Sequence, residues 1–220
     1  MSEAARERIL ARLRSVPRPE PPPPEAPGPP AGEVLDPGAL TTRLRFLLEA
    51  MRAEVHVVPA SERLPRLQAV LRQRPIRTLL YAPDSAIGAE LYAAWAADAA
   101  GLPELVPYDR PVEGFKETLF AVDAAVTTAA GAAADIGAII LRPDAREPRL
   151  MSLVPPVHIA VLHAATIHAS LEDAMREGRW SADMPSNLIL VSGPSKTADI
   201  ELTLAFGVHG PKELIVLILE

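Results

Sequence analysis

Two short apolar runs near the carboxyl end organise the pattern of the chain. Residues 188–191 and 214–219 are apolar at every position, which is typical of strands buried on both faces of a parallel sheet. Between them, residues 197–206 place several apolar side chains near one helical face, and Ser195 is positioned to cap that helix. We therefore expect a strand–helix–strand unit with a right-handed crossover.

Upstream of this unit, helical stripes alternate with strand-like runs. The pattern predicts helices at 36–51, 61–71, 85–100, 113–122 and 170–177, and strands at 55–58, 78–82, 105–106, 124–128, 133–141 and 157–163. The link at 129–132 is too short for a helical crossover, so the strands beside it are expected to pair as a hairpin or to bend. Alternating strands and helices indicate a layered α/β sheet.

The amino-terminal part has a different composition. Residues 1–14 can form a short amphipathic helix, and residues 17–30 are mostly proline, which is typical of a stiff spacer. We therefore divide the chain into an extension at 1–32 and an α/β domain at 33–220. The extension is either a docking element for a neighbouring subunit or a disordered tail.

Composition limits the classes of function. The chain has 220 residues and a formal net charge of −6, which argues against a nucleic-acid binder that neutralises phosphates. No apolar run reaches the roughly 18 residues of a membrane helix, and the amino terminus lacks a signal-peptide core. A cytoplasmic protein is expected. Cysteine is absent, which excludes disulfides, thiol catalysis and thiolate-ligated iron–sulfur clusters on this chain.

The loop after the first apolar run contains residue types that bind anions. Ser192, Gly193, Ser195, Lys196 and Thr197 would bring hydroxyls, an ammonium group and free backbone N–H groups to the start of the predicted helix. The sequence predicts either a small-anion site here or an ordinary helix cap beside an exposed lysine.

Three motifs resemble those of the lactate-utilisation (LUD) family, particularly its C-type members. They are Ser-Gly-Pro-Ser-Lys-Thr-Ala-Asp-Ile-Glu at 192–201 followed by Gly-Val-His-Gly-Pro-Lys-Glu-Leu at 207–214, Ser-Leu-Val-Pro-Pro-Val-His-Ile at 152–159, and Ala-Asp-Ile-Gly-Ala at 134–138. In the third motif, Ile136 and Ala138 stand where the family commonly has hydroxyl residues. The resemblance extends from about residue 122 to the carboxyl terminus, and further upstream only in layout.

This resemblance implies a fold and a role. The fold would be a three-layer α/β sandwich with a mostly parallel sheet, similar to ribose-phosphate isomerases and CoA transferases. The role would be that of a component of an L-lactate utilisation system, which supports oxidation of L-lactate to pyruvate with iron–sulfur partner proteins. Because this chain has no cysteine, the clusters are expected on those partners. Assembly of the chain into homo-oligomers stays open.

Several polar residues are candidates for chemistry. Asp135 stands among small apolar residues, where desolvation would raise its pKa and suit a base or nucleophile, although a turn aspartate fits as well. His158 is either a catalytic group or a core histidine bonded to a backbone carbonyl. His209 belongs to a turn that could reach the anion loop, and Arg142 and Arg149 could bind a carboxylate.

Other chemistry has little support. The five histidines show no metal-ligand spacing, and no glycine-rich dinucleotide motif follows a strand. Two alternatives to the lactate-system subunit stay open: a stand-alone enzyme of isomerase or acyl-transfer type that uses Asp135 and the anion loop, and a small-anion binding or regulatory module. They are distinguished by whether Asp135, His158 and Ser195 share one concave site.

Overall fold

The computed structural model describes residues 6–7, 10–12, 15, 36–180, 182, 185–198, 204–206 and 209–220. The chain consists of two units, residues 1–33 and 34–220. Of the first unit only a few helical positions are described, so the predicted proline spacer lies outside the described residues. All elements named below belong to the second unit.

Helices and strands alternate along the second unit, as the sequence pattern predicts. The helices are α2 (Pro37–Ala50), α3 (Arg63–Arg72), α4 (Ala86–Ala97), α5 (Lys116–Ala121), α6 (Leu150–Leu153) and α7 (Leu171–Glu177). The strands are β1 (Glu54–Val58), β2 (Thr78–Tyr81), β3 (Glu104–Pro107), β4 (Ala124–Thr128), β5 (Gly131–Ala133), β6 (Ala138–Leu141), β7 (Val157–His163), β8 (Ile167–His168), β9 (Ile189–Val191), β10 (Lys196–Ala198), β11 (Leu204–Phe206) and β12 (Glu213–Leu219).

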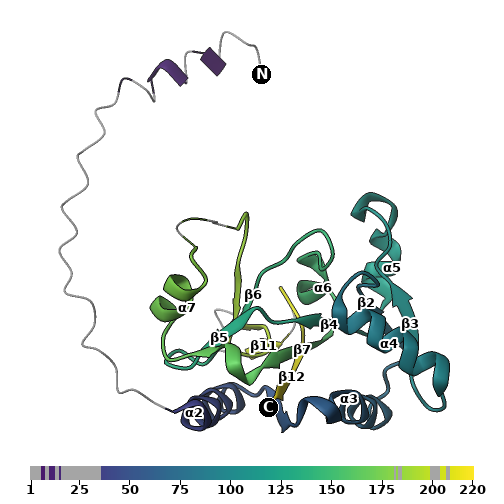
Figure 1. The fold of residues 1–220 in the computed structure, drawn as a ribbon. Helices are drawn as coiled ribbons and strands as arrows, with labels where there is room; N and C mark the ends of the chain where they lie inside the picture. The colour runs from purple at the N-terminus through teal and green to yellow at the C-terminus, as the bar shows by residue number, and fades with distance from the viewer. Residues whose placement is uncertain are drawn as a thin grey trace. The chain divides into compact units, whose positions relative to one another are not determined.

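A parallel sheet forms the centre of the unit. Within the described residues it has six strands in the order β1-β12-β7-β4-β2-β3 (Figure 1). Every neighbouring pair runs parallel. The predicted α/β fold with a mostly parallel sheet is therefore confirmed.

The apolar run at the carboxyl end becomes the strand β12, which is buried on both faces. Leu214, Val216 and Ile218 pack into the core on one face of the sheet, whereas the alternate residues of the strand pack into the core on the other face. Because side chains alternate across a strand, a strand covered on both sides must be apolar at consecutive positions. The pattern of this run was therefore sufficient to predict that the strand is buried on both faces.

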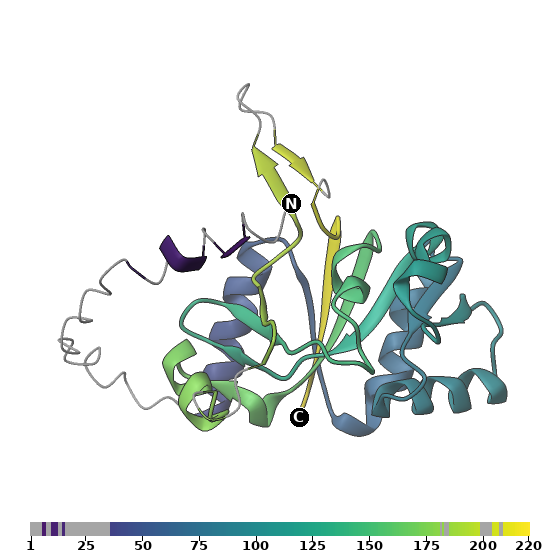
Figure 2. The same ribbon diagram turned by 90° about the horizontal axis from the view of Figure 1, so that it is seen from above.

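Helices cover both faces of the parallel sheet (Figure 2). On one face, α3 and α4 contribute buried side chains such as Leu71 and Leu91. On the other face, α2 packs beside a second sheet, and α5 and α6 contribute Leu119 and Met151 to a smaller cluster around Leu80. The layers of a three-layer α/β fold are thus present, with a second sheet added to one outer layer.

Of the two alternatives predicted for the link at 129–132, the bend is present and the hairpin is not. The strand β4 stays in the parallel sheet, and the chain bends at Ala129 and Ala130 to enter a mixed sheet of order β8-β5-β6-β9. The hairpin therefore lies inside the predicted strand at 133–141, between β5 and β6. Buried alanines at positions 132–134 allow this sheet to approach the central one closely.

The predicted helix at 197–206 is wrong at its two described ends, which are strands, while residues 199–203 lie outside the described residues. The predicted crossover is wrong as well. Strands β10 and β11 pair with each other as an antiparallel hairpin, and β9 belongs to the second sheet. The hairpin projects from the rest of the unit (Figure 2). The sequence at 199–206 also alternates apolar and mostly polar residues, which is the period of a strand.

Candidate functional site

The order of the strands marks one place at the edge of the parallel sheet. From β2 the chain passes to β3 on one side, returns to β4 on the other side of β2, and continues to β7 and β12 in that direction. The connection that follows β2 and the connection that follows β4 therefore run in opposite directions across the sheet. In open α/β sheets, ligands bind outside the carboxyl ends of the strands at such a switch point.

A cleft lies at this point of the structure. It has a volume of about 730 Å³ and is formed by the segments that follow β2, β3 and β6. Its polar lining consists of an aromatic hydroxyl, four carboxyl groups and two guanidinium groups, from Tyr108, Asp84, Asp109, Glu113, Asp144, Arg110 and Arg149. We call this hollow the carboxyl-end cleft.

A narrow recess adjoins the cleft at the end of β4. Its lining includes Thr127, Thr128, Glu147 and Ser152, and it shares Arg149 and a neighbouring proline with the cleft. The free volume is about 10 Å³, which is room for one water-sized group. We call it the β4 recess.

Glu147 is the charged group bound most directly to the end of β4. Its Oε2 accepts the backbone N–H of Thr128 at 2.8 Å, and its Oε1 accepts the Thr128 hydroxyl at 3.1 Å. Burial raises the pKa of the Glu147 carboxyl above its ordinary value, against the opposing effect of these two bonds and of the Ser85 hydroxyl. A carboxyl group with a raised pKa beside a cleft is a candidate for proton transfer.

The loop that carries Glu147 is held by its own hydrogen bonds. Asp144 Oδ1 accepts the backbone N–H groups of Arg146 and Glu147 at 2.7 and 2.9 Å. The N–H of Glu147 is the largest of the influences that lower the pKa of Asp144. At the other end of the loop, the carbonyl of Arg149 accepts the Ser152 hydroxyl at 2.9 Å. These bonds fix the backbone from which Glu147 and Arg149 project.

Comparison with known proteins gives the family. The LUD domain matches residues 43–219, which include both sheets and the segments that line the cleft and the recess. This chain belongs to the LUD domain family.

Relatives of this LUD domain include proteins with and without a described role. An uncharacterised protein of Neisseria meningitidis serogroup B is 33% identical over 186 residues, 82% of this chain and 78% of that protein. Lactate utilization protein C 1 of Bacillus mycoides is 33% identical over 104 residues, 46% of this chain and 44% of that protein. Lactate utilization protein C of Halalkalibacterium halodurans is 32% identical over 102 residues, 44% of each chain. The matches to these two proteins therefore span less than half of their length.

A solved structure shows the same fold. The crystal structure of a DUF162 family protein from Deinococcus radiodurans superimposes with a TM-score of 0.60 over 84% of this chain and 99% of that one, at 22% identity. The arrangement of strands and helices is thus shared at low sequence similarity.

Asp135 lies in the exposed turn between β5 and β6, so the predicted desolvation is wrong. Its Oδ1 accepts the N–H of Ile136 at 2.9 Å, and its own N–H donates to Ala169. This is the bonding of a turn aspartate. The turn is closed by Gly137, whose φ of +62° is unfavourable for other residues.

His158 is a core residue, 1% exposed, in the centre of β7. Its Nε2 lies 2.9 Å from the hydroxyl of Thr127, so its partner is a side chain and not the expected backbone carbonyl. Burial lowers the pKa of His158 to about 4. The imidazole is therefore neutral at physiological pH and has no direct access to solvent.

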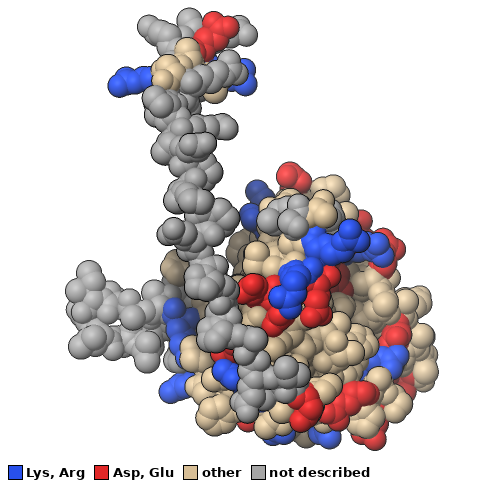
Figure 3. Space-filling view, turned by 60° about the vertical axis from the view of Figure 1, so that its left-hand side comes forward, with Lys and Arg blue, Asp and Glu red and all other residues tan. Residues whose placement is uncertain are grey.

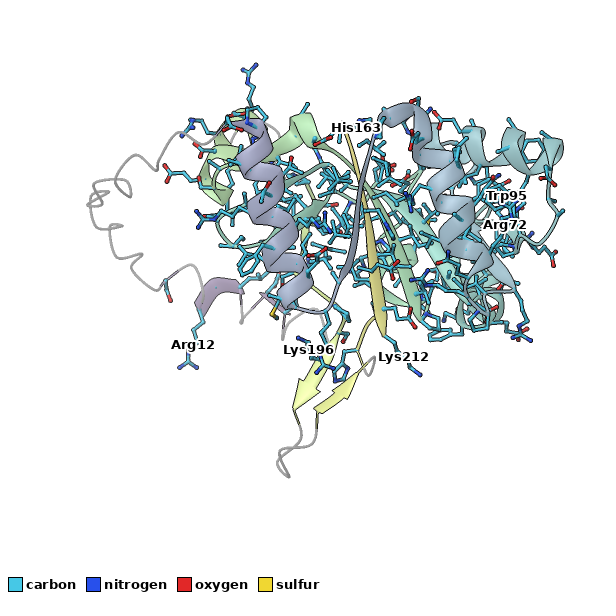
Figure 4. The ribbon with its side chains drawn as sticks, turned by 90° about the horizontal axis from the view of Figure 1, so that it is seen from below. Arg12, Arg72, Trp95, His163, Lys196 and Lys212 are labelled. Carbon is cyan, nitrogen blue, oxygen red and sulfur yellow. The ribbon has the colours of Figure 1, made fainter. Side chains whose placement is uncertain are left out.

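The predicted anion loop lies at the other end of the parallel strands. Lys212 directly precedes β12 and lies near Lys196 (Figure 4). His163 is the last residue of β7 and lies at the opposite, carboxyl end of the parallel strands. The N–H of Ser195 donates to the carbonyl of Pro211 at 2.9 Å, so this donor is already used. Gly193 packs against Met51 of the turn after α2. The helix dipole expected for the site is absent because residues 196–198 form a strand.

The candidate residues therefore do not meet in one hollow. Asp135, His158 and Ser195 line neither the carboxyl-end cleft, nor the β4 recess, nor the clefts of about 280 and 130 Å³ elsewhere in the described part of the chain. His209 is exposed next to Gly210, which packs against Ser195. Anion binding by Ser192, Gly193, Ser195, Lys196 and Thr197 stays a prediction, now without the helix.

Two other residues do reach the switch point. Arg142 lines the β4 recess and also a cleft of about 130 Å³ beside His168 and Trp180, and Arg149 lies where the recess meets the carboxyl-end cleft. Glu147 was not predicted, because nothing in a charged, proline-containing loop indicates which carboxylate folds back onto a strand. Its contact with Thr128 joins residues 19 positions apart.

Charge on the visible surface agrees with the composition. On the face shown in Figure 3, basic and acidic side chains lie next to one another and form no separate basic stripe. Among the described residues, no three His, Cys, Asp or Glu side chains are arranged to hold a metal ion. No helix in the described part of the chain is long and apolar enough to cross a membrane.

Proposed function

We propose that this LUD protein is a cytoplasmic subunit of an L-lactate utilisation system, which supports the oxidation of L-lactate to pyruvate together with iron–sulfur partner proteins. The observation that carries the proposal is membership of the LUD family together with similarity to two proteins named lactate utilization protein C. Those similarities cover less than half of each relative, so the assignment rests on the family and not on a full-length match.

The residues of the chain support a subunit over an autonomous redox enzyme. Oxidation of lactate removes two electrons, and the sequence contains no cysteine to ligate an iron–sulfur cluster that could receive them. The electron acceptor would therefore be held by a partner. The alternative of a stand-alone enzyme using Asp135 and the anion loop is disfavoured, because Asp135 is exposed in a turn and lines none of the described clefts.

Deletion of the gene in its native host tests the role. The deletion strain should fail to grow on L-lactate, should grow normally on pyruvate, and should recover when the full-length chain is supplied in trans. Growth on L-lactate at the parental rate would contradict the proposal. Loss of growth on both carbon sources would point to a general defect and would contradict it equally.

Purification of the tagged chain from the same host tests the partnership. We expect iron–sulfur proteins to co-purify, with iron and sulfide in the complex and none on this chain after the partners are removed. Stoichiometric iron and sulfide on the isolated chain would contradict the assignment of the clusters to partners.

A further inference from the structure

Arg149 provides a cationic group at the switch point. The other guanidinium group of the carboxyl-end cleft is already engaged, because Arg110 Nε lies 2.8 Å from Asp109 Oδ1. The Arg149 side chain is exposed, and within the described residues its guanidinium group forms no ion pair. Its backbone is fixed by the bond from Ser152. An arginine held in this way can bind a carboxylate through two parallel hydrogen bonds.

The charges around the cleft limit the size of an anionic ligand. Four carboxyl groups (Asp84, Asp109, Glu113 and Asp144) face two guanidinium groups (Arg110 and Arg149), an excess of two acidic groups. The pair between Asp109 and Arg110 is already included in this excess, whereas the negative charge of Asp144 is partly compensated by the two backbone N–H groups that it accepts. The remaining field disfavours polyanions such as nucleotides and coenzyme A. One carboxylate beside Arg149 is compatible with it.

The β4 recess is built to accept a hydroxyl group. The hydroxyl hydrogen of Thr128 is donated to Glu147, and that of Ser152 to the carbonyl of Arg149. Each of these two oxygens can still accept a hydrogen bond, as can the Glu147 carboxylate. The free volume of about 10 Å³ admits one such group and no longer chain.

We propose that the carboxyl-end cleft binds a small 2-hydroxy monocarboxylate, with its carboxylate on Arg149 and its hydroxyl in the β4 recess against Thr128, Ser152 and Glu147. The two halves of the site meet at Arg149, which lines both the cleft and the recess. A carboxylate and a hydroxyl on adjacent carbons match this juxtaposition. The choice of L-lactate as the ligand to test rests on the proposed function, whereas Arg149 and the adjoining hydroxyl-lined recess support the chemical class.

Binding to the full-length protein can be followed by NMR titration with L-lactate, pyruvate and propionate. We expect L-lactate to shift signals of the loop at 144–149 and of Thr128. Propionate lacks the hydroxyl group, so it should bind about tenfold more weakly, the loss expected when a buried acceptor is left unpaired. Pyruvate offers an acceptor in place of a donor and should also bind more weakly. Equal affinity for all three ligands would overturn the assignment of the recess.

Substitutions separate this site from nonspecific anion binding. Arg149→Gln should weaken L-lactate binding about tenfold or more, whereas Arg146→Gln, on the same loop and exposed, should change it less than about twofold. Glu147→Gln keeps the shape of the side chain and should reduce the preference for L-lactate over propionate. Ser195→Ala/Lys196→Ala alters only the predicted anion loop at the other end of the strands, so it should leave the L-lactate shifts of Thr128 and of the loop at 144–149 unchanged. Equal binding by wild type and Arg149→Gln, or shifts confined to residues 192–196, would overturn the proposal.

The outcome is independent of the test of function. A strain that requires the chain for growth on L-lactate, combined with unchanged binding by Arg149→Gln, would retain the proposed function and remove this site. Specific binding that depends on Arg149, combined with normal growth of the deletion strain, would retain the site and remove the role in lactate utilisation. Absence of binding at tens of millimolar L-lactate would overturn the site alone.

Discussion

Two neighbouring threonines at the end of β4 form hydrogen bonds with two polar side chains, one in the core and one at the cleft. Thr127 is buried and bonds to His158 in the core, whereas Thr128 bonds to Glu147 at the edge of the cleft. Because successive side chains of a strand point to opposite faces, one strand end can satisfy both groups without their meeting. His158 is thereby a structural group, and Glu147 is the group with access to a ligand.

The buried imidazole predicts a loss of stability in acid. The pKa of His158 is about 4 in the folded protein, against an ordinary value of 6.5. The unfolded chain therefore binds a proton between these values while the folded chain does not. The neutral, buried imidazole therefore causes no loss of stability above pH 6.5. As the pH falls from 6.5 towards 4, the free energy of unfolding decreases, by about 2 kcal/mol at pH 5.

Urea denaturation at several pH values checks this expectation. Wild type should lose about 2 kcal/mol more than His158→Gln between pH 7 and pH 5, and the exposed His163 at the end of the same strand offers a matched control in His163→Gln. The same pH dependence in wild type and His158→Gln would show that the imidazole is not buried in its neutral form.

Gly137 illustrates a position where only one residue type fits. Its φ is +62°, and an added Cβ would lie 2.4 Å from the Cβ of Leu47 on α2. Gly137→Ala should therefore destabilise the fold by about 2 kcal/mol or more in thermal or urea unfolding. Gly114→Ala, whose added Cβ meets nothing within 4 Å, should stay within about 0.5 kcal/mol. Leu47→Ala in the Gly137→Ala background should leave the penalty unrelieved, since the contact is with the Cβ. A neutral Gly137→Ala variant would contradict the close packing of this turn on α2.

At the scale of elements, burial decides which patterns can be interpreted. From Leu214 to Leu219 the strand β12 has core on both faces and only apolar residues, and α2 has a clear stripe that includes Leu44 and Leu48. Residues 197–206 carry apolar residues that fit both a helical and a strand period. The choice between the two depends on tertiary context, which the local pattern does not contain.

The hairpin of β10 and β11 is expected to be dispensable for the stability of the domain. In the part of the chain that the structure describes, these two strands pair with each other and with no other strand, so shortening the hairpin leaves the hydrogen bonds of both larger sheets intact. Thr197 and Ala205 lie directly opposite each other, so an Asn-Gly turn can join them in place of residues 198–204. The shortened protein should unfold at the same urea concentration as wild type. A large loss of stability, or of cooperativity, would show that the hairpin contributes to the core.

At the scale of the molecule, the sequence was sufficient for the class of fold but not for the site. Parallel strands with two buried faces are visible in apolar runs such as 214–219, and the helices that cover them have stripes of their own. The carboxyl-end cleft depends on the order of strands in the sheet, which no local pattern determines. Arg142 and Arg149 were recognised by residue type, but their place beside Thr128 required the fold.

The division of the chain into two units gives the last prediction. The described strands and the three buried clusters all lie in residues 34–220. The proline-rich sequence before them has few N–H groups with which to extend a sheet. A protein that begins at Ala31 should therefore unfold in one cooperative transition at the melting temperature of the full chain, as measured by circular dichroism and calorimetry. If the amino-terminal segment docks on partner proteins, the same truncation should reduce co-purification of those partners while the fold is retained. A broadened or lost transition would instead show that residues 1–30 complete the core of the domain.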